Sequence, residues 1–475
     1  MGKPTGFMEY KRENNLEIKP LERIKNFNEF HVPMSEEERS VQASRCMDCG
    51  VPFCQSGMMI GGMASGCPLN NLIPEWNDMV YRNGYEQALG RLLKTNNFPE
   101  FTSRVCPALC ENACTCGLNQ EAVASKSNEY AIIENAYEMG YAKANPPKVR
   151  TGKKVAVIGS GPSGLTCAGD LAKLGYDVTV FEALHELGGV LVYGIPEFRL
   201  PKQKVVAKEI EKVKELGVKF ETNVVIGKST TIDQLMEEEG FEAVFIGSGA
   251  GLPMFMGIPG ENANEVFSAN EYLTRSNLMK AFREDYDTPI AAGKKVAVVG
   301  GGNVAMDAAR TALRLGAEVH IVYRRSEAEL PARAEEVHHA KEEGIIFDLL
   351  TNPKKINVDE KGNITSMTVV KMELGEPDAS GRRRPVEIEG SEYDIEVDTV
   401  IMSLGTSPNP LISSTTKGLE TNRRKCIVAE EENGQTSKEG VFAGGDAVTG
   451  AATVILAMGA GKAGAKGIDE YLKNK

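Results

Sequence analysis

Cysteines in the first quarter of the chain have the types and spacing that metal binding requires. Eight of the ten cysteines lie there, in the order Cys46, Cys49, Cys54, Cys67, Cys106, Cys110, Cys114 and Cys116. Structural zinc sites usually pair two Cys-x2-Cys knuckles, or one knuckle with histidines. Only Cys46 and Cys49 form such a knuckle, and His31 is the only histidine before His185. The wider spacings favour iron–sulfur clusters, which commonly take several local cysteines and one distant ligand.

Length, charge and hydropathy narrow the classes of protein. A chain of 475 residues is too long for one core, so two to four domains are expected. The net charge of −12 argues against a nucleic-acid or membrane-surface partner, because both are negatively charged. No apolar run could cross a bilayer, and the opening residues MGKPTGFMEY lack the order of a signal peptide. We therefore expect a cytoplasmic protein.

Three states are possible for the clustered thiols: two [4Fe–4S] clusters, zinc, or unliganded cysteines. A cytosolic chain keeps its thiols reduced, so a disulfide framework is not expected. The spacing favours the two clusters, with one local group of cysteines between Cys46 and Cys54 and another between Cys106 and Cys114. Cys167 and Cys426 stand alone and are predicted to be core residues.

A glycine-rich turn between a strand and a helix marks a first dinucleotide site. The apolar residues 155–158 predict a strand that runs into the pattern Gly159-x-Gly161-x-x-Gly164, and a helical stretch follows. Glycines let the backbone approach a pyrophosphate, and the helix N-terminus supplies N–H donors. A second strand ends at Glu182, the distance at which an acidic residue binds a ribose. Its carboxylate can accept both ribose hydroxyls, and a 2′-phosphate would prevent this.

The same pattern returns with different chemistry at the end of its second strand. Residues 300–305 (GGGNVA) follow another apolar strand, and Ala305 takes the position of the third glycine. Tyr323 stands where the first fold has its carboxylate, and Arg324 and Arg325 follow. Arginine binds phosphate bidentately and keeps its charge. The second site is therefore predicted to prefer NADP(H) to NAD(H).

Two unlike nucleotide sites indicate FAD in the first fold and NADPH in the second. The C-terminal stretch supports this, because an apolar strand leads into Gly444-Gly445-Asp446 and a helix-like run. Asp446 can bind a ribityl hydroxyl, and the next helix can face the flavin. The predicted FAD-site residues are Gly159, Ser160, Gly161, Pro162, Ser163, Gly164, Glu182, Gly189, Gly247, Gly445, Asp446 and Thr453. The predicted NADPH-site residues are Gly300, Gly301, Gly302, Asn303, Val304, Ala305, Arg324 and Arg325.

The predicted fold class is α/β, with a helical iron–sulfur domain followed by two interleaved Rossmann-like domains. Residues 243–250 and 399–409 are expected to be crossings between the two nucleotide folds, which places the NADPH domain inside the FAD domain. The predicted ranges are 1–148 for the cluster domain, 149–286 and 403–475 for the two parts of the FAD domain, and 287–402 for the NADPH domain.

Several long segments resemble a known family. MGKPTGFMEYKR, CPLNNLIPEWNDMVYRNG, LLKTNNFPEFTSRVCPALCE and GGVLVYGIPEFRLPK are similar to the small (beta) subunit of bacterial glutamate synthase. From about residue 196 onward, other segments are closer to the large subunit of an electron-bifurcating NADH-dependent ferredoxin:NADP oxidoreductase. Both belong to the flavin- and iron–sulfur-containing NADPH oxidoreductases. We weight the N-terminal segments more, because partner docking in the family uses the cluster domain.

The resemblance also implies a crossed assignment of the cluster ligands. The family, which includes the N-terminal part of dihydropyrimidine dehydrogenase, would place Cys114 with the first group, and Cys67 with Cys106 and Cys110. The implied ligands of one cluster are Cys46, Cys49, Cys54 and Cys114. The implied ligands of the other are Cys67, Cys106, Cys110 and a fourth, for which Glu129 matches the family position and Cys116 is the alternative.

The function implied by the resemblance is electron input. NADPH would pass a hydride to FAD, and the clusters would pass single electrons to a large amidotransferase subunit that makes L-glutamate from L-glutamine and 2-oxoglutarate. The first alternative is an electron-bifurcating transhydrogenase with a small flavin and [2Fe–2S] subunit and ferredoxin. A stand-alone NADPH:acceptor reductase and a non-enzymatic redox sensor are further alternatives. No acid–base residue is expected, because the cofactors carry the chemistry. The chain alone should not make glutamate, because it has no N-terminal cysteine nucleophile.

Overall fold

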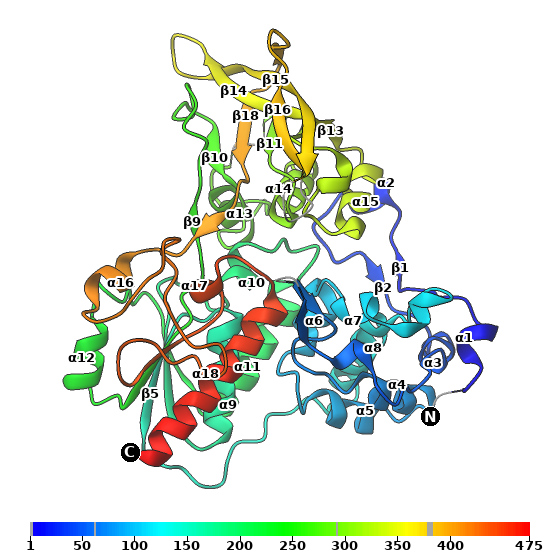
Figure 1. Cartoon of the computed structure of the whole chain (residues 1–475), viewed down its shortest axis with the longest axis vertical. Helices are drawn as coiled ribbons and strands as arrows, with labels where there is room; N and C mark the ends of the chain where they lie inside the picture. Colours follow the sequence, from blue (N-terminus) through cyan, green and yellow to red (C-terminus); the bar gives the residue numbers. More distant parts are fainter. Residues whose placement is uncertain (1–2, 61–62, 291–292, 378–382) are drawn as a thin grey trace.

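A helical module and two dinucleotide-binding folds make up the described part of the chain (Figure 1). The structure is a computed structural model that describes residues 3–60, 63–290, 293–377 and 383–475. The helical module lies beside both folds, and the second fold rises above the first. The long C-terminal helix crosses the first fold.

Short amphipathic helices build the N-terminal module. In α5, Tyr85, Ala88, Leu89 and Leu92 repeat at helical spacing, and all four are buried. The start of α3 has a capping box, in which the Ser35 backbone N–H donates to Glu38 at 2.7 Å. The helices are α1 (Gly6–Glu9), α2 (Pro20–Arg23), α3 (Glu36–Ser44), α4 (Ile73–Tyr81), α5 (Tyr85–Leu92), α6 (Pro99–Val105), α7 (Leu109–Asn112) and α8 (Ser125–Glu138), with 3-10 turns η1 (Phe53–Gln55) and η2 (Thr115–Leu118). The hairpins are β1 (Leu16–Glu17) with β2 (His31–Val32), and β3 (Met58–Ile60) with β4 (Met63–Ser65).

A parallel five-stranded sheet forms the first dinucleotide fold. Its order is β20-β8-β5-β6-β7, so the strand that carries the first glycine pattern lies at the centre. Apolar side chains fill β5 and β8, as expected for parallel strands covered on both faces. The strands are β5 (Lys154–Ile158), β6 (Asp177–Phe181), β7 (Lys219–Glu221), β8 (Ala243–Ile246) and β20 (Val441–Ala443). The helices and helical turns are α9 (Pro162–Lys173), α10 (Val190–Tyr193), η3 (Lys202–Val206), α11 (Ala207–Glu215), α12 (Ile232–Glu237), α16 (Leu411–Thr415), α17 (Asp446–Thr449) and α18 (Val454–Asn474).

A second parallel sheet lies between β8 and β20 in the sequence. Its order is β10-β18-β11-β12-β13, and β11 carries the second glycine pattern. The strands are β10 (Val266–Ser268), β11 (Lys295–Val299), β12 (Glu318–Tyr323), β13 (Ile346–Leu349) and β18 (Thr399–Met402). The helices are α13 (Ala269–Asn277), α14 (Asn303–Arg314) and α15 (Ala334–Glu342), with the turn η4 (Glu327–Glu329). The second fold is thus inserted into the first, as the sequence predicts.

The division between the two folds differs from the predicted one. Strand β10 pairs with β18, and α13 follows it, so residues 266–277 belong with the second sheet. The second fold therefore begins ahead of β10 rather than at residue 287. No local pattern indicates this, because β10 has three residues and carries no motif. Strands β9 (Leu252–Pro253) and β19 (Thr406–Ser407) pair antiparallel and form the two crossings.

An antiparallel sheet extends the second fold and was not predicted. It comprises β14 (Thr351–Val358), β15 (Ile364–Pro377), β16 (Arg383–Glu387) and β17 (Tyr393–Ile395). Ile356, Met367 and Val369 on this sheet share a core with Val299 and Met402 of the parallel sheet. Among the described residues, no helix has the length and apolar character needed to span a membrane.

The N-terminal helical module, which carries the clustered cysteines and is called the cluster module below, packs directly on the first fold. One continuous core joins Trp76 and Phe101 of the module to Val157 and Leu165 of the fold. Polar contacts close the same seam, since Asn97 donates to Asp170 on α9 at 2.7 Å and accepts from Lys462 on α18 at 2.8 Å. The module and the fold are therefore held as one body.

Candidate functional site

The first glycine pattern forms a tight turn between β5 and α9. Gly159 has φ +95°, which glycine adopts without strain. A Cβ added to Gly164 would lie 1.9 Å from the Gly159 carbonyl oxygen, so no side chain fits there. Gly189 also has positive φ, and its Cβ would lie 3.0 Å from Gly161 Cα. The glycines are therefore required for the backbone contacts that leave the N-terminus of α9 free to face a phosphate.

Glu182 follows β6 and is bonded to the glycine-rich turn. Its carboxylate accepts the Ser160 backbone N–H at 2.9 Å and the Ser160 hydroxyl at 2.5 Å. Its other oxygen accepts the Leu184 N–H at 2.9 Å, and the residue is 6 % exposed. Both carboxylate oxygens therefore act as hydrogen-bond acceptors in the turn. This suits a ribose with free hydroxyls and opposes a phosphate.

Two later segments of the chain close around the start of α9. A Cβ at Gly247, after β8, would lie 2.9 Å from Ser163 Oγ, and one at Gly445 would lie 2.8 Å from the same atom. Asp446 begins α17, and burial raises its pKa to about 6. Thr453 caps α18 by accepting the Leu456 N–H. Four chain segments that are far apart in sequence thus meet at one place, namely the start of α9 and the segments at Gly189, Gly247 and Gly445.

Tyr193 belongs to this site and was not among the predicted residues. It ends α10, and its pKa is raised to about 12 by burial and by the nearby charges of Asp446 and Glu182. Its hydroxyl lies 3.7 Å from where a Cβ of Gly251 would stand. The sequence carries no spacing signal for it, because only the fold brings α10 between the two carboxylates.

The second glycine pattern is as crowded as the first at its first glycine and differs from it at the start of the helix. Gly300 has φ +141°, and a Cβ there would lie 2.2 Å from the Ser403 carbonyl oxygen, whereas one at Gly302, as at Gly161, would have no atom within 4 Å. Ala305 is fully buried in α14, whereas Val304 is 45 % exposed. Asn303 accepts the backbone N–H of Arg333 at 3.0 Å, which ties the pattern to the segment before α15.

The two predicted phosphate-binding arginines lie at the end of β12. Arg324 is exposed, and the Arg325 Nε donates to the Arg383 carbonyl at 3.0 Å. The ring of Tyr323 would contact a Cβ at Gly301 and donates its hydroxyl to the Glu329 carbonyl at 2.7 Å. The strand end therefore offers guanidinium groups beside the second turn and no carboxylate of its own.

The cysteines of the first group lie near one another despite their separation in sequence. Burial raises the pKa of Cys46 to about 11, and charge on the neighbouring Cys114 and Cys49 adds to the rise. Burial raises the pKa of Cys54 to about 12, with the same three cysteines as neighbours. Cys49 Sγ is 3.3 Å from the hydroxyl of Thr115, which follows Cys114.

A second group of acids surrounds Glu129 on α8. Burial raises the pKa of Cys67 to about 12, and neighbouring Cys106 and Glu129 add to the rise. Cys110 is partly buried beside Cys106, Cys67 and Glu129, and desolvation raises its pKa as well. Glu129 accepts from Asn96 at 2.9 Å and from the Thr102 hydroxyl.

Cys116 lies with the first group of cysteines. The interaction of Cys116 with Cys114 lowers the pKa of Cys114 and raises that of Cys116. Cys116 Sγ also contacts the Arg45 carbonyl at 3.5 Å. Its neighbours are thus Cys114 and Cys46 rather than Glu129.

Both groups fit a cofactor that brings positive charge. Each gathers buried acids whose ionised forms repel one another, and metal binding removes that penalty because ligands bind deprotonated. Four thiols suit a [4Fe–4S] cluster directly, and three thiols with a carboxylate complete a second donor set. The second group also lies close to the first fold, since Cys67 and Cys106 belong to the core that the module shares with it.

Comparison with known proteins adds the family. Residues 23–141 match the family of dihydropyrimidine dehydrogenase domain II, 4Fe-4S cluster. Residues 125–240 and 153–461 match pyridine nucleotide-disulphide oxidoreductases. The glutamate synthase [NADPH] small chain of Bacillus subtilis is 39 % identical over 99 % of both chains. The chain belongs to the glutamate synthase small-chain family. The small chain of Escherichia coli is 37 % identical over 96 % of both chains.

Solved structures share the fold of this small-chain family member at lower identity. FprA of Mycobacterium tuberculosis in complex with NADPH has a TM-score of 0.57 at 18 % identity, over 68 % of this chain and 85 % of that one. Thioredoxin reductase of Lactococcus lactis has a TM-score of 0.51 at 22 % identity, over 68 % of this chain and all of that one. The predicted fold class and the resemblance are confirmed, and the relatives do not favour the transhydrogenase alternative. The predicted enzyme class, a nicotinamide-dependent flavin oxidoreductase with a 4Fe–4S domain, is confirmed as well.

Proposed function

We propose that this chain is the NADPH-oxidising electron-input subunit of a glutamate synthase. Its partner would be the large subunit, which makes L-glutamate from L-glutamine and 2-oxoglutarate. Bound at the sites described, the cofactors would supply the redox chemistry, a hydride transfer from NADPH to FAD and single-electron transfer by the clusters. Similarity along nearly the whole chain to two proteins named glutamate synthase [NADPH] small chain supports this role.

The observation that carries the proposal is the docking of the cluster module on the first fold. The module shares its core with α9, whose N-terminus lies in the predicted FAD site. Leu69, two residues after Cys67, contacts α18, and the N-terminus of α18 lies in the same site. A module that only stabilised the fold would have no need for two buried groups of acids. Cys67 and Cys106 of the second group belong to the core that the module shares with the first fold.

We assign the FAD and NADPH sites to the residues predicted from the sequence. Glu182 would accept the ribose hydroxyls of FAD, and the start of α9 would face its pyrophosphate. Asp446 would contact the ribityl chain. Arg324 and Arg325 would bind the 2′-phosphate of NADPH, because guanidinium groups bind phosphate bidentately.

Two [4Fe–4S] clusters would lie in the helical module. The first would be bound by Cys46, Cys49, Cys54 and Cys114. The second would be bound by Cys67, Cys106, Cys110 and Glu129. The proximity of Glu129 to the three thiols, and of Cys116 to Cys114, supports the carboxylate as the fourth ligand.

Reconstitution with the large subunit tests the function. The isolated chain should oxidise NADPH with an artificial acceptor and form no glutamate from glutamine and 2-oxoglutarate. Adding the large subunit should produce NADPH-dependent glutamate. Isolation of the chain from its own cells with a small flavin and [2Fe–2S] subunit, together with ferredoxin-dependent NADPH chemistry, would overturn the proposal.

Iron analysis tests the ligand assignment. Cys46→Ser should lower iron and sulfide while flavin stays bound, and Cys426→Ser, at a buried and isolated cysteine, is the matched control. Glu129→Ala should lose about half of the roughly eight iron atoms expected per chain, whereas Cys116→Ser should keep them. The reverse result would make Cys116 the fourth ligand.

A further inference from the structure

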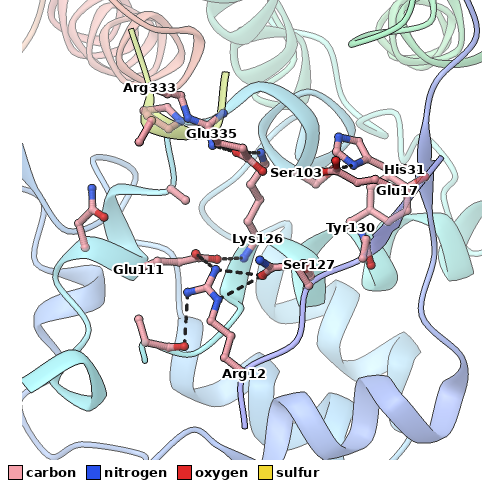
Figure 2. Close-up of a pocket in the computed structure, with 17 residues that line it drawn as sticks. Arg12, Glu17, His31, Ser103, Glu111, Lys126, Ser127, Tyr130, Arg333 and Glu335 are labelled. Atoms are coloured by element: carbon pink, nitrogen blue, oxygen red, sulfur yellow. Dashed lines mark hydrogen bonds and ion pairs between the residues drawn. The ribbon is translucent and has the colours of Figure 1, made fainter. Parts of the chain in front are cut away.

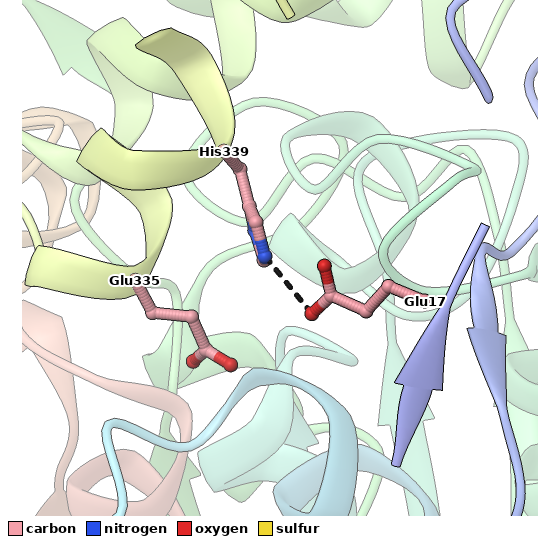
Figure 3. A group of neighbouring side chains, drawn as sticks. All are labelled: Glu17, Glu335 and His339. Carbon is pink, nitrogen blue, oxygen red and sulfur yellow. Dashed lines mark hydrogen bonds and ion pairs between the residues drawn. The ribbon is translucent and has the colours of Figure 1, made fainter. Parts of the chain in front are cut away.

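Four side chains outside the redox sites face one another across a gap between the N-terminal hairpin and α15. Strands β1 and β2 pair antiparallel with Glu17 directly opposite His31, so both side chains leave the same face. On α15, Glu335 and His339 are four residues apart and share one face of the helix. Figure 3 shows His339 and Glu17 pointing at one another, with Glu335 beside them.

The distances match a donor set for a metal ion. His339 Nε2 is 3.0 Å from Glu17 Oε1, and His31 Nδ1 is 3.8 Å from the same oxygen. One ligand atom each of Glu17, Glu335 and His339 lie within 4.8 Å of one another. One imidazole nitrogen and two carboxylate oxygens, with water in the fourth position, are a donor set that zinc accepts, and the two carboxylates balance the charge of a divalent cation.

The outer contacts leave one oxygen of each carboxylate available. Arg23 bonds Glu17 through Oε2 at 3.0 Å. Arg333 bonds Glu335 through Oε2, and Lys126 Nζ is 3.7 Å from that oxygen. Metal-binding carboxylates are commonly oriented by such outer hydrogen bonds. The three cations also repel a metal ion, so we expect affinity in the micromolar range rather than that of a closed structural zinc site.

A cavity gives the site access to solvent. Glu17, His31 and Glu335 line a cavity of about 510 Å³ between the hairpin, α8 and α15 (Figure 2). His339 is 3 % exposed and contacts the lining residue Glu17. A hydrated ion can therefore reach the ligands without unfolding the module.

We propose that Glu17, Glu335 and His339 bind a divalent cation of the zinc class, with His31 beside Glu17, and that the ion joins the N-terminal hairpin to α15 of the second fold. The hairpin is already anchored there by Arg23, which bonds Glu342 at 2.6 Å and Glu343 at 2.7 Å. The metal would add a second link between the hairpin and α15, through Glu17 Oε1 rather than the Oε2 that Arg23 bonds. This role is structural and separate from electron transfer.

Zinc binding to the intact holoenzyme tests the site. After removal of loosely bound metal under anaerobic conditions, equilibrium dialysis against micromolar Zn²⁺ should load one zinc per chain with no loss of iron. His339→Gln and Glu335→Gln should each weaken binding at least tenfold. The matched control is His338→Gln, because His338 is the next residue on α15 and its side chain is 74 % exposed.

A second readout keeps the test decisive if the buried His339 variant folds poorly. Glu335 is 40 % exposed at its side chain, so Glu335→Gln should fold. Zinc should slow hydrogen exchange in residues 16–32 of the wild-type chain and leave the exchange of the Glu335→Gln chain unchanged. Equal zinc binding by wild type and both variants, or no zinc bound at 100 μM by the wild type, would mean that the four residues form an ion-pair cluster only.

Discussion

The two dinucleotide-binding folds have the same arrangement of strands around the glycine-rich turn. They differ in the segments that pack around that turn. In the first fold, Gly247 and Gly445 come from distant segments and press on Ser163 at the start of α9. In the second, Ser403 after β18 closes on Gly300 as Gly247 closes on Gly159, and Arg333 bonds to Asn303 at the start of α14. Val304 at the start of α14 is half-exposed, whereas Ser163 at the matching helix start is buried. A helix start that Gly445 also covers suits a resident cofactor, and an exposed helix start suits a nucleotide that must exchange.

The C-terminal helix α18, which is rich in small residues, covers the turn of the first fold and accounts for this difference. On α18, a Cβ at Gly461 would lie 2.3 Å from the Ser163 carbonyl, and one at Gly464 would lie 2.2 Å from Phe245. The helix can approach α9 and β8 so closely only because these side chains are absent. The second fold has Ala305 where the first has Gly164, which is compatible with looser packing of α14.

The largest effect that tests this comparison is expected from Gly164→Ala. The new methyl group would meet the Gly159 carbonyl at 1.9 Å, and a backbone atom cannot move aside without opening the turn. We expect a loss of more than about 3 kcal/mol, with loss of flavin, as for severe overpacking. Flavin content and the unfolding midpoint measure it. The converse change, Ala305→Gly, should cost only about 1 kcal/mol, and a flavin-replete Gly164→Ala chain would show that the first turn is as loose as the second.

A smaller effect is expected from Glu182→Gln. The amide keeps the shape but replaces an acceptor by a donor beside the Ser160 and Leu184 N–H groups. A hydrogen bond to a charged group is worth about 1.5–3 kcal/mol, so FAD affinity should fall roughly 10- to 100-fold. Titration of the deflavinated chain with FAD measures this. Unchanged FAD affinity would remove Glu182 from the site.

The double change Arg324→Ala, Arg325→Ala is the matching test of the second fold. Removing two guanidinium groups should raise the KM for NADPH roughly 10- to 100-fold, because hydrogen bonds between charged groups are lost. The KM for NADH should stay within about twofold, since NADH has no 2′-phosphate. Equal losses for both nucleotides would contradict the assignment and point to a general role in the strand end.

The smallest effect is expected from the contact between His320 and Asp348 in the second sheet. His320 on β12 contacts Asp348 on β13 at 2.7 Å, and this contact raises the pKa of His320 above 6.5. The stabilisation is complete below about pH 6.5 and is lost as pH rises through the raised pKa. Because the pair is partly solvated, we expect less than about 1 kcal/mol. His320→Gln should remove this pH dependence from hydrogen exchange in β12 and β13. The first sheet has Thr179 at the matching register and should show none.

Local sequence patterns were enough to predict the two dinucleotide-binding folds. Gly159, Glu182 and Gly300 were found from spacing, and the structure places each at the turn or strand end that the pattern predicted. Spacing failed where a residue's neighbours come from elsewhere in the chain. It grouped Cys114 with Cys106, whereas the resemblance and the fold place Cys114 beside Cys46. Tyr193 and the sheet membership of β10 also had no local signal.

The sequence by itself determined the two glycine patterns, the contrast between Glu182 and the arginine pair, and the content of acids in the helical module. These features are local, because a turn and the strand after it are set by residues close in the chain. Only the tertiary structure decided which acids share a group, with Glu129 beside Cys110 and Cys116 beside Cys114. It also brought the hairpin residue Glu17 to His339 on α15. Such contacts depend on how helices and strands pack across long separations, which no periodicity in the chain records.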